Sequence, residues 1–300
     1  MAAAKNSKRV SAERGLAQRA SGPLSKQPLS WTTGALEQAL LAEFPAADAE
    51  AWDRTGLTVG DPARLIRGIA VALDPTVEAI ETAADRGANV LVTHHPAFLA
   101  PPDSFMPASS VAANPGAGVW RAVQREVSVM SFHTALDVSA RVQRVLPGML
   151  SLSFERVLMP LAGSVEKGYG QLCVPAKDDD LTLGQLAARC TSVFARSPRV
   201  WGDFSRPLER MVTCTGSAGD LGRACLRAQV DCLVCGEIKY HEALELSQAG
   251  LAVIDLGHDT SELPLVAVLV AAIEGVGIPR ESITVVDQGE NWTYPETVRV

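Results

Sequence analysis

The sequence predicts an α/β protein, and three observations carry that prediction. Short apolar runs typical of buried strands alternate along the chain with segments of helical periodicity. Several of these strands end directly in histidine or carboxylate residues, as expected of a ligand site at the carboxyl ends of strands. The length of 300 residues is also generous for one core and suits two modest domains.

The first half of the chain contains a strand, helix and strand within about 25 residues, a spacing that favours a parallel βαβ unit. Thr and Pro residues mark the predicted helix starts, and glycine marks a helix end. The predicted elements are a helix from Thr32 or Thr33 to Phe44, a strand over 68–73, a helix from Pro75 to Gly87, a strand over 89–93, a helix over 119–125 and a strand over 127–132.

The second half continues the alternation, although residues 140–205 show the weakest pattern. The predicted elements there are strands over 172–174, 211–215, 230–235, 251–256 and 283–286, and helices over 183–193, 221–228, from Tyr240 onward, and from about 262 to 273. If the last helix begins at Thr260, Pro264 falls in its first turn, where a missing amide proton is tolerated.

Charge is unevenly distributed along the chain. The formal net charge is -7, yet residues 1–30 carry six basic side chains and one acid. We interpret 1–30 as a disordered basic tail; its composition also resembles a mitochondrial transit peptide, an alternative to a cytoplasmic location. The remaining acidic body argues against nucleic acid as a partner. The longest apolar run, 263–273, is too short to span a membrane, so we expect no membrane partner.

The six cysteines show no disulfide framework. Cys232 and Cys235 form an isolated C-x-x-C within an apolar run, without the second pair that a zinc knuckle requires. Buried, reduced thiols are therefore predicted.

Five polar side chains follow predicted strands and form the candidate metal site. His94 and His95 follow the strand over 89–93, Asp137 comes after the next strand, and His258 follows a third, with Glu262 four residues later. Three imidazoles and two carboxylates are too many for one catalytic zinc ion with an open position, and they suit two ions with a bridging carboxylate. Nitrogen and oxygen ligands without sulfur fit Zn, Mn, Fe, Co or Ni alike.

Five motifs occur in an order that resembles the Nif-three-like family, whose members are often labelled GTP cyclohydrolase 1 type 2 homologues. They are Trp52-Asp53 with Gly56-Leu57 and Val59-Gly60-Asp61, Val92 to Pro96, His133 to Asp137, Gly236 to His241, and Gly257 to Glu262. The resemblance covers about residues 35–298. It implies two α/β domains with mixed sheets, a metal site between them at the carboxyl ends of strands, and a toroidal homohexamer.

The family's metal ligands carry over to His94, His95, Asp137, His258 and Glu262. We expect a discontinuous metal-binding domain, 31–135 plus 236–300, and an inserted second domain, 136–235. Three departures from the family motifs are Arg54-Thr55 in place of Asn-Val, Ala135 in place of Asn, and Val138 to Arg141 in place of a glycine-containing segment.

Two functional hypotheses follow. The first is a metal-dependent hydrolase that uses a metal-bound hydroxide on a phosphoester or nucleotide-like small molecule, with Glu237 or His241 transferring protons. The second is a non-enzymatic metal-handling protein or oligomeric adaptor with the same ligands. His133 and His241 could support ligands, face a substrate or simply pack. Gly216 to Gly219 could hold an anion or form a tight turn.

Overall fold

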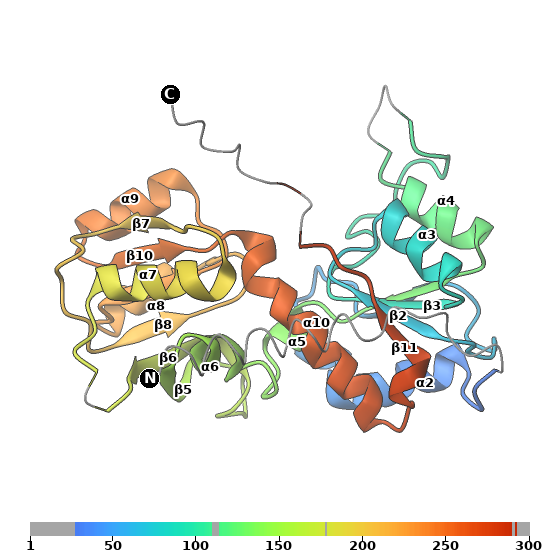
Figure 1. Ribbon diagram of the computed structural model, residues 1–300, viewed down its shortest axis with the longest axis horizontal. Helices are drawn as coiled ribbons and strands as arrows, with labels where there is room; N and C mark the ends of the chain where they lie inside the picture. Colours follow the sequence, from blue (N-terminus) through green and yellow to red (C-terminus); the bar gives the residue numbers. More distant parts are fainter. Residues whose placement is uncertain (1–27, 110–113, 178, 290–291, 293–300) are drawn as a thin grey trace. The chain divides into compact units, whose positions relative to one another are not determined.

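The computed structural model describes residues 28–109, 114–177, 179–289 and 292, and these divide into two compact units. The first unit comprises the described residues of Met1–Ala46, Ala51–His133 and Leu269–Val300. The second comprises Ala47–Glu50 and the described residues of Thr134–Val268. The described strands form one sheet in each unit, and both sheets mix parallel and antiparallel pairs (Figure 1). The predicted α/β class with mixed sheets is confirmed.

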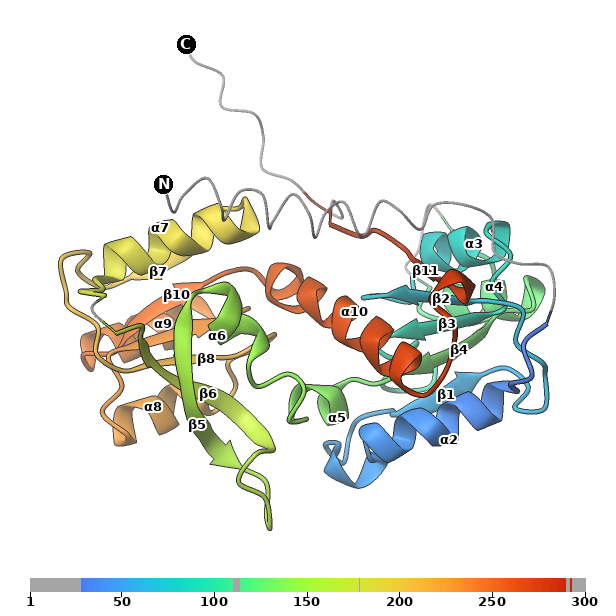
Figure 2. The same ribbon diagram turned by 60° about the horizontal axis from the view of Figure 1, so that its bottom comes forward.

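The sheet of the first unit has the strand order β1-β4-β3-β2-β11. Strands β4, β3, β2 and β11 run parallel, and β1 pairs antiparallel with β4. Helices α3 and α4 pack on one face, where Ala79 and Ile80 join a core with Leu91 and Val129 (Figure 2). The bounds are β1 Gly56–Val59, β2 Ile69–Ala72, β3 Val90–Thr93, β4 Ser128–Ser131, β11 Ile283–Val285, α2 Thr33–Glu43, α3 Val77–Asp85, α4 Ala117–Gln124, and the 3₁₀ turns Ala46–Asp48 and Arg280–Ser282.

The helix starts of this unit follow the expected capping chemistry. The Thr32 side chain accepts a hydrogen bond from Ala35 N (3.1 Å), and Thr76 accepts one from Ala79 N (3.0 Å). Gly87, with a φ of 88°, follows α3 in a conformation that favours glycine. The predicted βαβ unit is confirmed, because β2 and β3 pair in parallel on either side of α3.

The sheet of the second unit has the order β5-β6-β8-β9-β10-β7, with β8, β9 and β10 parallel. Side chains alternate across it. Cys232 and Val234 face a core that includes α7, whereas Leu233 and Cys235 face a core with α8 and α9. The bounds are β5 Leu152–Pro160, β6 Gly168–Pro175, β7 Arg199–Trp201, β8 Met211–Thr213, β9 Cys232–Cys235, β10 Ala252–Asp255, α5 Thr134–Asp137, α6 Val145–Met149, α7 Leu183–Phe194, α8 Leu221–Arg227, and α9 Tyr240–Gln248.

The division between units differs from the sequence-based expectation at 236–268. Those residues were expected to return to the metal-binding domain. In the structure β10 lies between β9 and β7 within the second sheet, so the backbone ladder holds 252–255 in the second unit. The long segment of the second unit begins at Thr134 rather than 136, and the unit also includes Ala47–Glu50.

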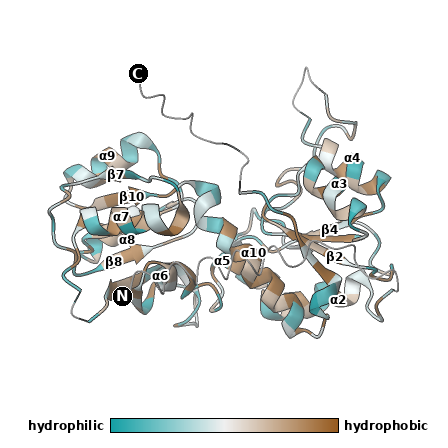
Figure 3. Cartoon of the chain, in the orientation of Figure 1, coloured by the Kyte–Doolittle hydropathy of each residue, from teal (hydrophilic) through white to brown (hydrophobic). Residues whose placement is uncertain are grey.

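Helix α10 (His258–Gly275) starts earlier than predicted. Ser261 N donates to Gly257 O (3.2 Å), so helical hydrogen bonding begins with residue 257. Pro264 therefore lies inside the helix and beyond its first turn, and the expectation that it falls in the first turn is wrong. The hydrophobic colouring of α10 is concentrated toward its carboxyl end (Figure 3). No described helix combines the length and apolar composition needed to cross a bilayer.

The predicted basic tail falls mainly on residues 1–27, outside the described residues. Residues 28–30 are described, and Leu29 N donates to Ile66 O (2.7 Å), so this end of the expected tail is tied to the first unit.

The prediction of buried, reduced cysteines is confirmed. All six thiols are free and buried, and all six lie in the second unit. Burial raises the pKa of the Cys173, Cys190 and Cys225 thiols from 9.0 to about 12. These thiols stay neutral and inert at ordinary pH.

Candidate metal centre

Three histidines follow neighbouring parallel strands of the first unit. His94 and His95 come directly after β3, and His133 comes two residues after β4 ends. The ladder extends past the strands, because His95 N donates to Leu73 O (3.0 Å) and Phe132 N donates to Thr93 O (3.0 Å). Parallel pairing places the carboxyl ends of both strands at one edge of the sheet, which brings the three imidazoles together.

The three imidazoles are close enough to share one ion. One nitrogen from each of His94, His95 and His133 lies within 4.8 Å of the others. The ring centroids are 4.9 Å apart for His94 and His95, 5.1 Å for His94 and His133, and 5.4 Å for His95 and His133. Three neutral imidazoles around one point form a typical zinc-type ligand set.

An acceptor holds the Nδ1 atom of each of these rings. Nδ1 of His94 lies 3.2 Å from Phe132 O, that of His95 lies 2.7 Å from Asp74 Oδ1, and that of His133 lies 3.0 Å from Asp53 Oδ1. A carbonyl or carboxylate oxygen only accepts, so each Nδ1 carries the proton. Nε2 then has the lone pair, and metal-binding histidines are oriented by this kind of contact.

The second unit holds Asp137, His258 and Glu262. Asp137 is the last residue of α5, and its Oδ1 accepts a hydrogen bond from Thr215 Oγ1 (3.3 Å). His258 and Glu262 lie one turn apart on α10, with His258 Nε2 3.2 Å from Glu262 Oε2. Glu262 is buried, with only 2% of the residue exposed.

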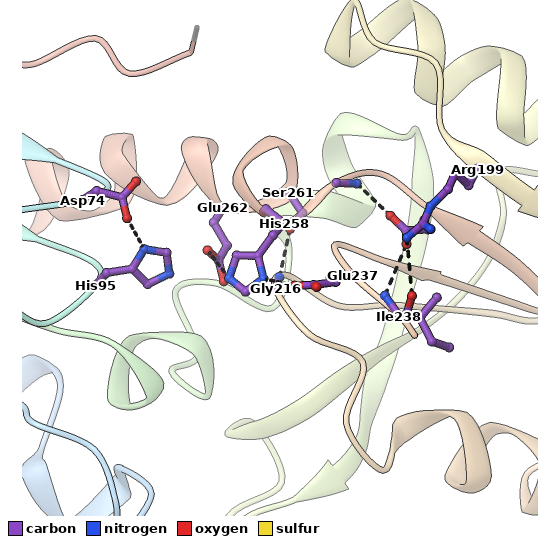
Figure 4. A network of polar contacts seen from close by, with 11 residues as sticks. Asp74, His95, Arg199, Gly216, Glu237, Ile238, His258, Ser261 and Glu262 are labelled. Atoms are coloured by element: carbon purple, nitrogen blue, oxygen red, sulfur yellow. Dashed lines mark hydrogen bonds and ion pairs between the residues drawn. The ribbon is translucent and has the colours of Figure 1, made fainter. Parts of the chain in front are cut away.

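His258 has a carboxylate at each ring nitrogen. Nδ1 lies 2.9 Å from Glu237 Oε2 (Figure 4). Nε2 lies 3.2 Å from Glu262 Oε2, where a metal ion would take the place of a proton. His258 and Glu262 thus offer one nitrogen and one oxygen donor to a metal ion.

The segment after β8 closes around these carboxylates. Burial raises the pKa of the Cys214 thiol, with further contributions from Cys225, Asp137 and Glu262. A Cβ on Gly216, which has a φ of 60°, would lie 2.3 Å from Glu262 Oε1. Gly216 N donates to Ser261 Oγ (2.9 Å), so this amide is not available to an anion, and the positive φ values of Gly216 and Gly219 fit a tight turn.

A buried carboxylate ties the two loops that carry Glu237 and His258. Asp255 Oδ1 accepts from Gly257 N (3.0 Å), and Oδ2 accepts from Ile238 N (3.2 Å). Arg199 donates to the same Oδ2 (Figure 4). Asp255 is 4% exposed, so these contacts satisfy a buried charge and fix both loops.

The predicted site residues are divided between the two units. His94 and His95 lie together in the first unit, and Asp137, His258 and Glu262 belong to the second, each unit being described by itself. Glu237 contacts His258, whereas the exposed His241 on α9 has its ring beside Tyr240, at a centroid distance of 5.2 Å.

Sequence reasoning left the role of His133 open and missed Asp53 and Asp74. Asp74 lies two residues after β2, so its position at a strand end was a usable signal. Asp53 lies in an irregular segment, where only its membership of the Trp52-Asp53 family motif marks it. Beside it the indole of Trp52 is 56% exposed and lies edge-on to His133, with ring centroids 5.7 Å apart.

Comparisons with known proteins point in one direction. Residues 32–286 match the model of the family described as Duf34/NIF3 (NGG1p interacting factor 3). The chain is 28% identical over 234 residues to the "GTP cyclohydrolase 1 type 2 homolog" of Clostridium acetobutylicum, covering 77% of this chain and 85% of the relative. It is 31% identical over 235 residues to the protein of the same name from Streptomyces coelicolor, covering 75% and 80%.

A solved structure supports the fold. The chain resembles the crystal structure of Staphylococcus aureus hypothetical protein SA1388 with a TM-score of 0.74 and 21% identity, covering 90% of this chain and all of that one. At this identity the likeness shows the fold alone.

Proposed function

This chain belongs to the Duf34/NIF3 family, and from that premise we propose that it binds two divalent metal ions through His94, His95, Asp137, His258 and Glu262. His133 is a further imidazole available to the ion that His94 and His95 bind. The donors are nitrogen and oxygen atoms, which suit Zn, Mn, Fe, Co or Ni.

The observation that carries this proposal is the acceptor at Nδ1 of each histidine in the two ligand groups. His94, His95, His133 and His258 each have a carbonyl or carboxylate oxygen there, which directs Nε2 toward a ligand. Histidines that only pack in a core need no such common arrangement. A carboxylate or carbonyl behind each ring is the arrangement that orients metal ligands and raises their basicity.

We propose further that the protein is a metal-dependent hydrolase acting on a phosphoester or nucleotide-like small molecule. When bound, two metal ions supply Lewis acidity and lower the pKa of coordinated water. Glu237 is suited to exchange protons with solvent, because its side chain is 58% exposed and contacts His258. His241, also exposed, is the second candidate for proton transfer.

Trp52 supports a substrate with a planar ring. Its exposed indole lies beside His133 and offers an aromatic surface on which a heterocycle can stack. Arg54, which occupies the place of the usual family Asn, is an exposed cation two residues away. An aromatic side chain beside the His133 imidazole, with a cation two residues along the chain, suits an anionic, ring-containing substrate.

The alternative proposal is a metal-handling protein or oligomeric adaptor. It requires the same ligands but no turnover. We also propose a homohexamer, on the basis of the family resemblance. The proposed location is the cytoplasm, and the composition of the basic tail makes the mitochondrion the alternative.

Metal content and turnover of matched variants test these proposals. We expect about two metal equivalents in the wild type, and sharply less in His95→Ala and Glu262→Ala, because each loses a ligand. His241→Ala is the matched control, since it removes an exposed histidine outside the ligand set and should retain both equivalents. Elemental analysis after reconstitution with Zn, Mn and Fe provides the measurement. Retention of full metal content by both ligand variants would refute the ligand assignment.

Assays on the same samples separate the two functions. Hydrolysis of an aryl phosphodiester or opening of the GTP ring, measured against metal content, supports the hydrolase if activity follows the metal and falls in His241→Ala or Glu237→Gln. Two bound equivalents with no turnover of either substrate favour metal handling.

A further inference from the structure

Gln288 is a buried side-chain amide whose hydrogen bonds converge on the segment after β2. The residue is 7% exposed. Its Oε1 accepts from Leu73 N and Asp74 N, both at 2.9 Å, and its Nε2 donates to Asp74 O (3.1 Å) and toward Thr76 Oγ1 (3.5 Å). One side chain from the end of the chain thus holds the backbone of Asp74 on both sides.

The held segment carries the carboxylate that orients His95. Asp74 Oδ1 lies 2.7 Å from His95 Nδ1 (Figure 4). The Asp74 side chain is 30% exposed, so water competes for its oxygens. A fixed backbone keeps the carboxylate aimed at the imidazole and lowers the entropic cost of that contact.

We propose that Gln288 is a positioning residue that acts through Asp74 to keep Nε2 of His95 available for metal. This inference rests on the proposed metal binding by His95. Gln288 touches neither His95 nor any other proposed ligand in the hydrogen bonds described for it, so its effect must pass through Asp74.

The chemistry of the contact explains why a glutamine is needed. The backbone amide protons of Leu73 and Asp74 require an acceptor, and the Asp74 carbonyl oxygen requires a donor; one side-chain amide supplies both. Methionine fills a similar volume but leaves these groups unpaired, at a cost of about 1–3 kcal/mol for each buried group. The Asp74 backbone is then free to turn, and the carboxylate leaves Nδ1 of His95.

Asn89 provides a matched control. It is another buried amide of the first unit, with 0% exposure, and its Oδ1 accepts from Arg67 N (2.7 Å) while Nδ2 donates to Leu65 O (2.9 Å). It directly precedes β3, whereas His94 and His95 follow that strand. Asn89→Ala therefore loses comparable hydrogen bonds at the opposite end of the strand.

Competition between the full-length protein and a chromophoric chelator for Zn²⁺ measures the effect. Gln288→Ala and Gln288→Met should each weaken Zn²⁺ binding by about tenfold, and Asn89→Ala should stay within about twofold of wild type. In an Asp74→Ala background, Gln288→Met should have no further effect on Zn²⁺ affinity, because the intermediary is gone. Circular dichroism establishes that each variant is folded. If Gln288→Ala is unfolded, the comparison uses Gln288→Met.

A second readout needs no metal. Nitrogen-15 NMR of metal-free protein should find His95 protonated on Nδ1 in the wild type and in Asn89→Ala, and as a mixture of tautomers in Gln288→Met. If the wild type fails to bind Zn²⁺, the proposed metal binding is contradicted. The positioning role of Gln288 is then tested by the His95 tautomer alone. An unchanged tautomer in folded Gln288→Met, or equal Zn²⁺ affinities in Gln288→Met and Asn89→Ala, would overturn it.

Discussion

In both units an acceptor holds Nδ1 of the candidate histidine ligands, but the surroundings of these rings differ. In the first unit His94 is fully buried and the Asp53 side chain, which faces His133, is 0% exposed, although Asp74, which faces His95, is 30% exposed. In the second unit the His258 side chain is 39% exposed and its partner Glu237 is 58% exposed. Buried partners hold a ring in one orientation, whereas exposed partners exchange contacts with water. The comparison indicates a more rigid set of candidate ligands in the first unit and a more solvent-exposed set in the second.

Removal of one histidine from each unit gives the largest expected contrast. His94→Ala should weaken Zn²⁺ binding by more than about 100-fold. Loss of a residue that only hydrogen-bonds to a ligand already lowers metal affinity by about 10–100-fold, and His94 is a proposed ligand itself. His258→Ala should cost less, because an exposed ring is less preorganised. Isothermal titration of both variants checks this. A larger loss in His258→Ala would reverse the assigned roles of the two units.

Truncating the partners sharpens the same comparison. Asp53→Ala should weaken Zn²⁺ binding by about tenfold, because His133 loses its buried acceptor, whereas Glu237→Ala should cost about threefold, because water replaces the exposed carboxylate. Chelator competition on both variants, with folding verified by circular dichroism, measures the ratio. Equal losses would mean that exposure does not distinguish the partners.

A glycine pair tests how closely the second unit packs around Glu262. Gly216→Ala should lower the free energy of unfolding by about 2 kcal/mol or more, since its Cβ meets Glu262 Oε1 in a left-handed conformation. Gly219→Ala should cost only about 1 kcal/mol, because Gly219 has a φ of 49° and no neighbouring atom within 4 Å of the added Cβ. Urea unfolding of both variants gives the difference, and equal costs would show that Glu262 moves aside.

A last expected effect is alkaline destabilisation of the second unit, which contains all six thiols. The unfolded thiol of Cys190 loses its proton above its ordinary pKa of 9.0, whereas the folded thiol keeps it up to about 12. The folded state therefore binds more protons between these values, and the free energy of unfolding falls as pH rises through them.

Each buried thiol should contribute up to about 1.4 kcal/mol per pH unit to this fall. Urea unfolding at pH 8 and pH 10 measures the slope, and Cys190→Ala should reduce it. An unchanged slope in the alanine variant would mean that the thiol ionises in the folded protein.

The order of the elements could be predicted from sequence because each depended on a local signal. Thr32, Thr76 and Gly87 mark helix ends through hydrogen bonds to the nearest turn or through a conformation that favours glycine. The buried strands before His94 and before His258 are short apolar runs. Local chemistry therefore located the candidate ligands as well.

What could not be predicted depends on residues far apart in the chain. The partners Asp74 and Asp53 face His95 and His133 only after the strands have paired. Placement of β10 within the second sheet depends on its antiparallel partner β7, a short strand with no clear alternation. The first turn of α10 also has a long-range contact, from Gly216 N to Ser261 Oγ, which local propensity does not encode.

The pairing of β11 with β2 has a consequence for how the molecule is made. Ile283 pairs with Ile69, so the first sheet contains two strands separated by nearly the whole second unit. During synthesis from the amino terminus, β2 keeps an open edge until the ribosome has released the last strand. The second unit is almost one continuous stretch of chain and can fold before that moment. Slow translation or early termination therefore affects the first unit selectively. It leaves an edge of β2 exposed, and this edge can pair with another nascent chain.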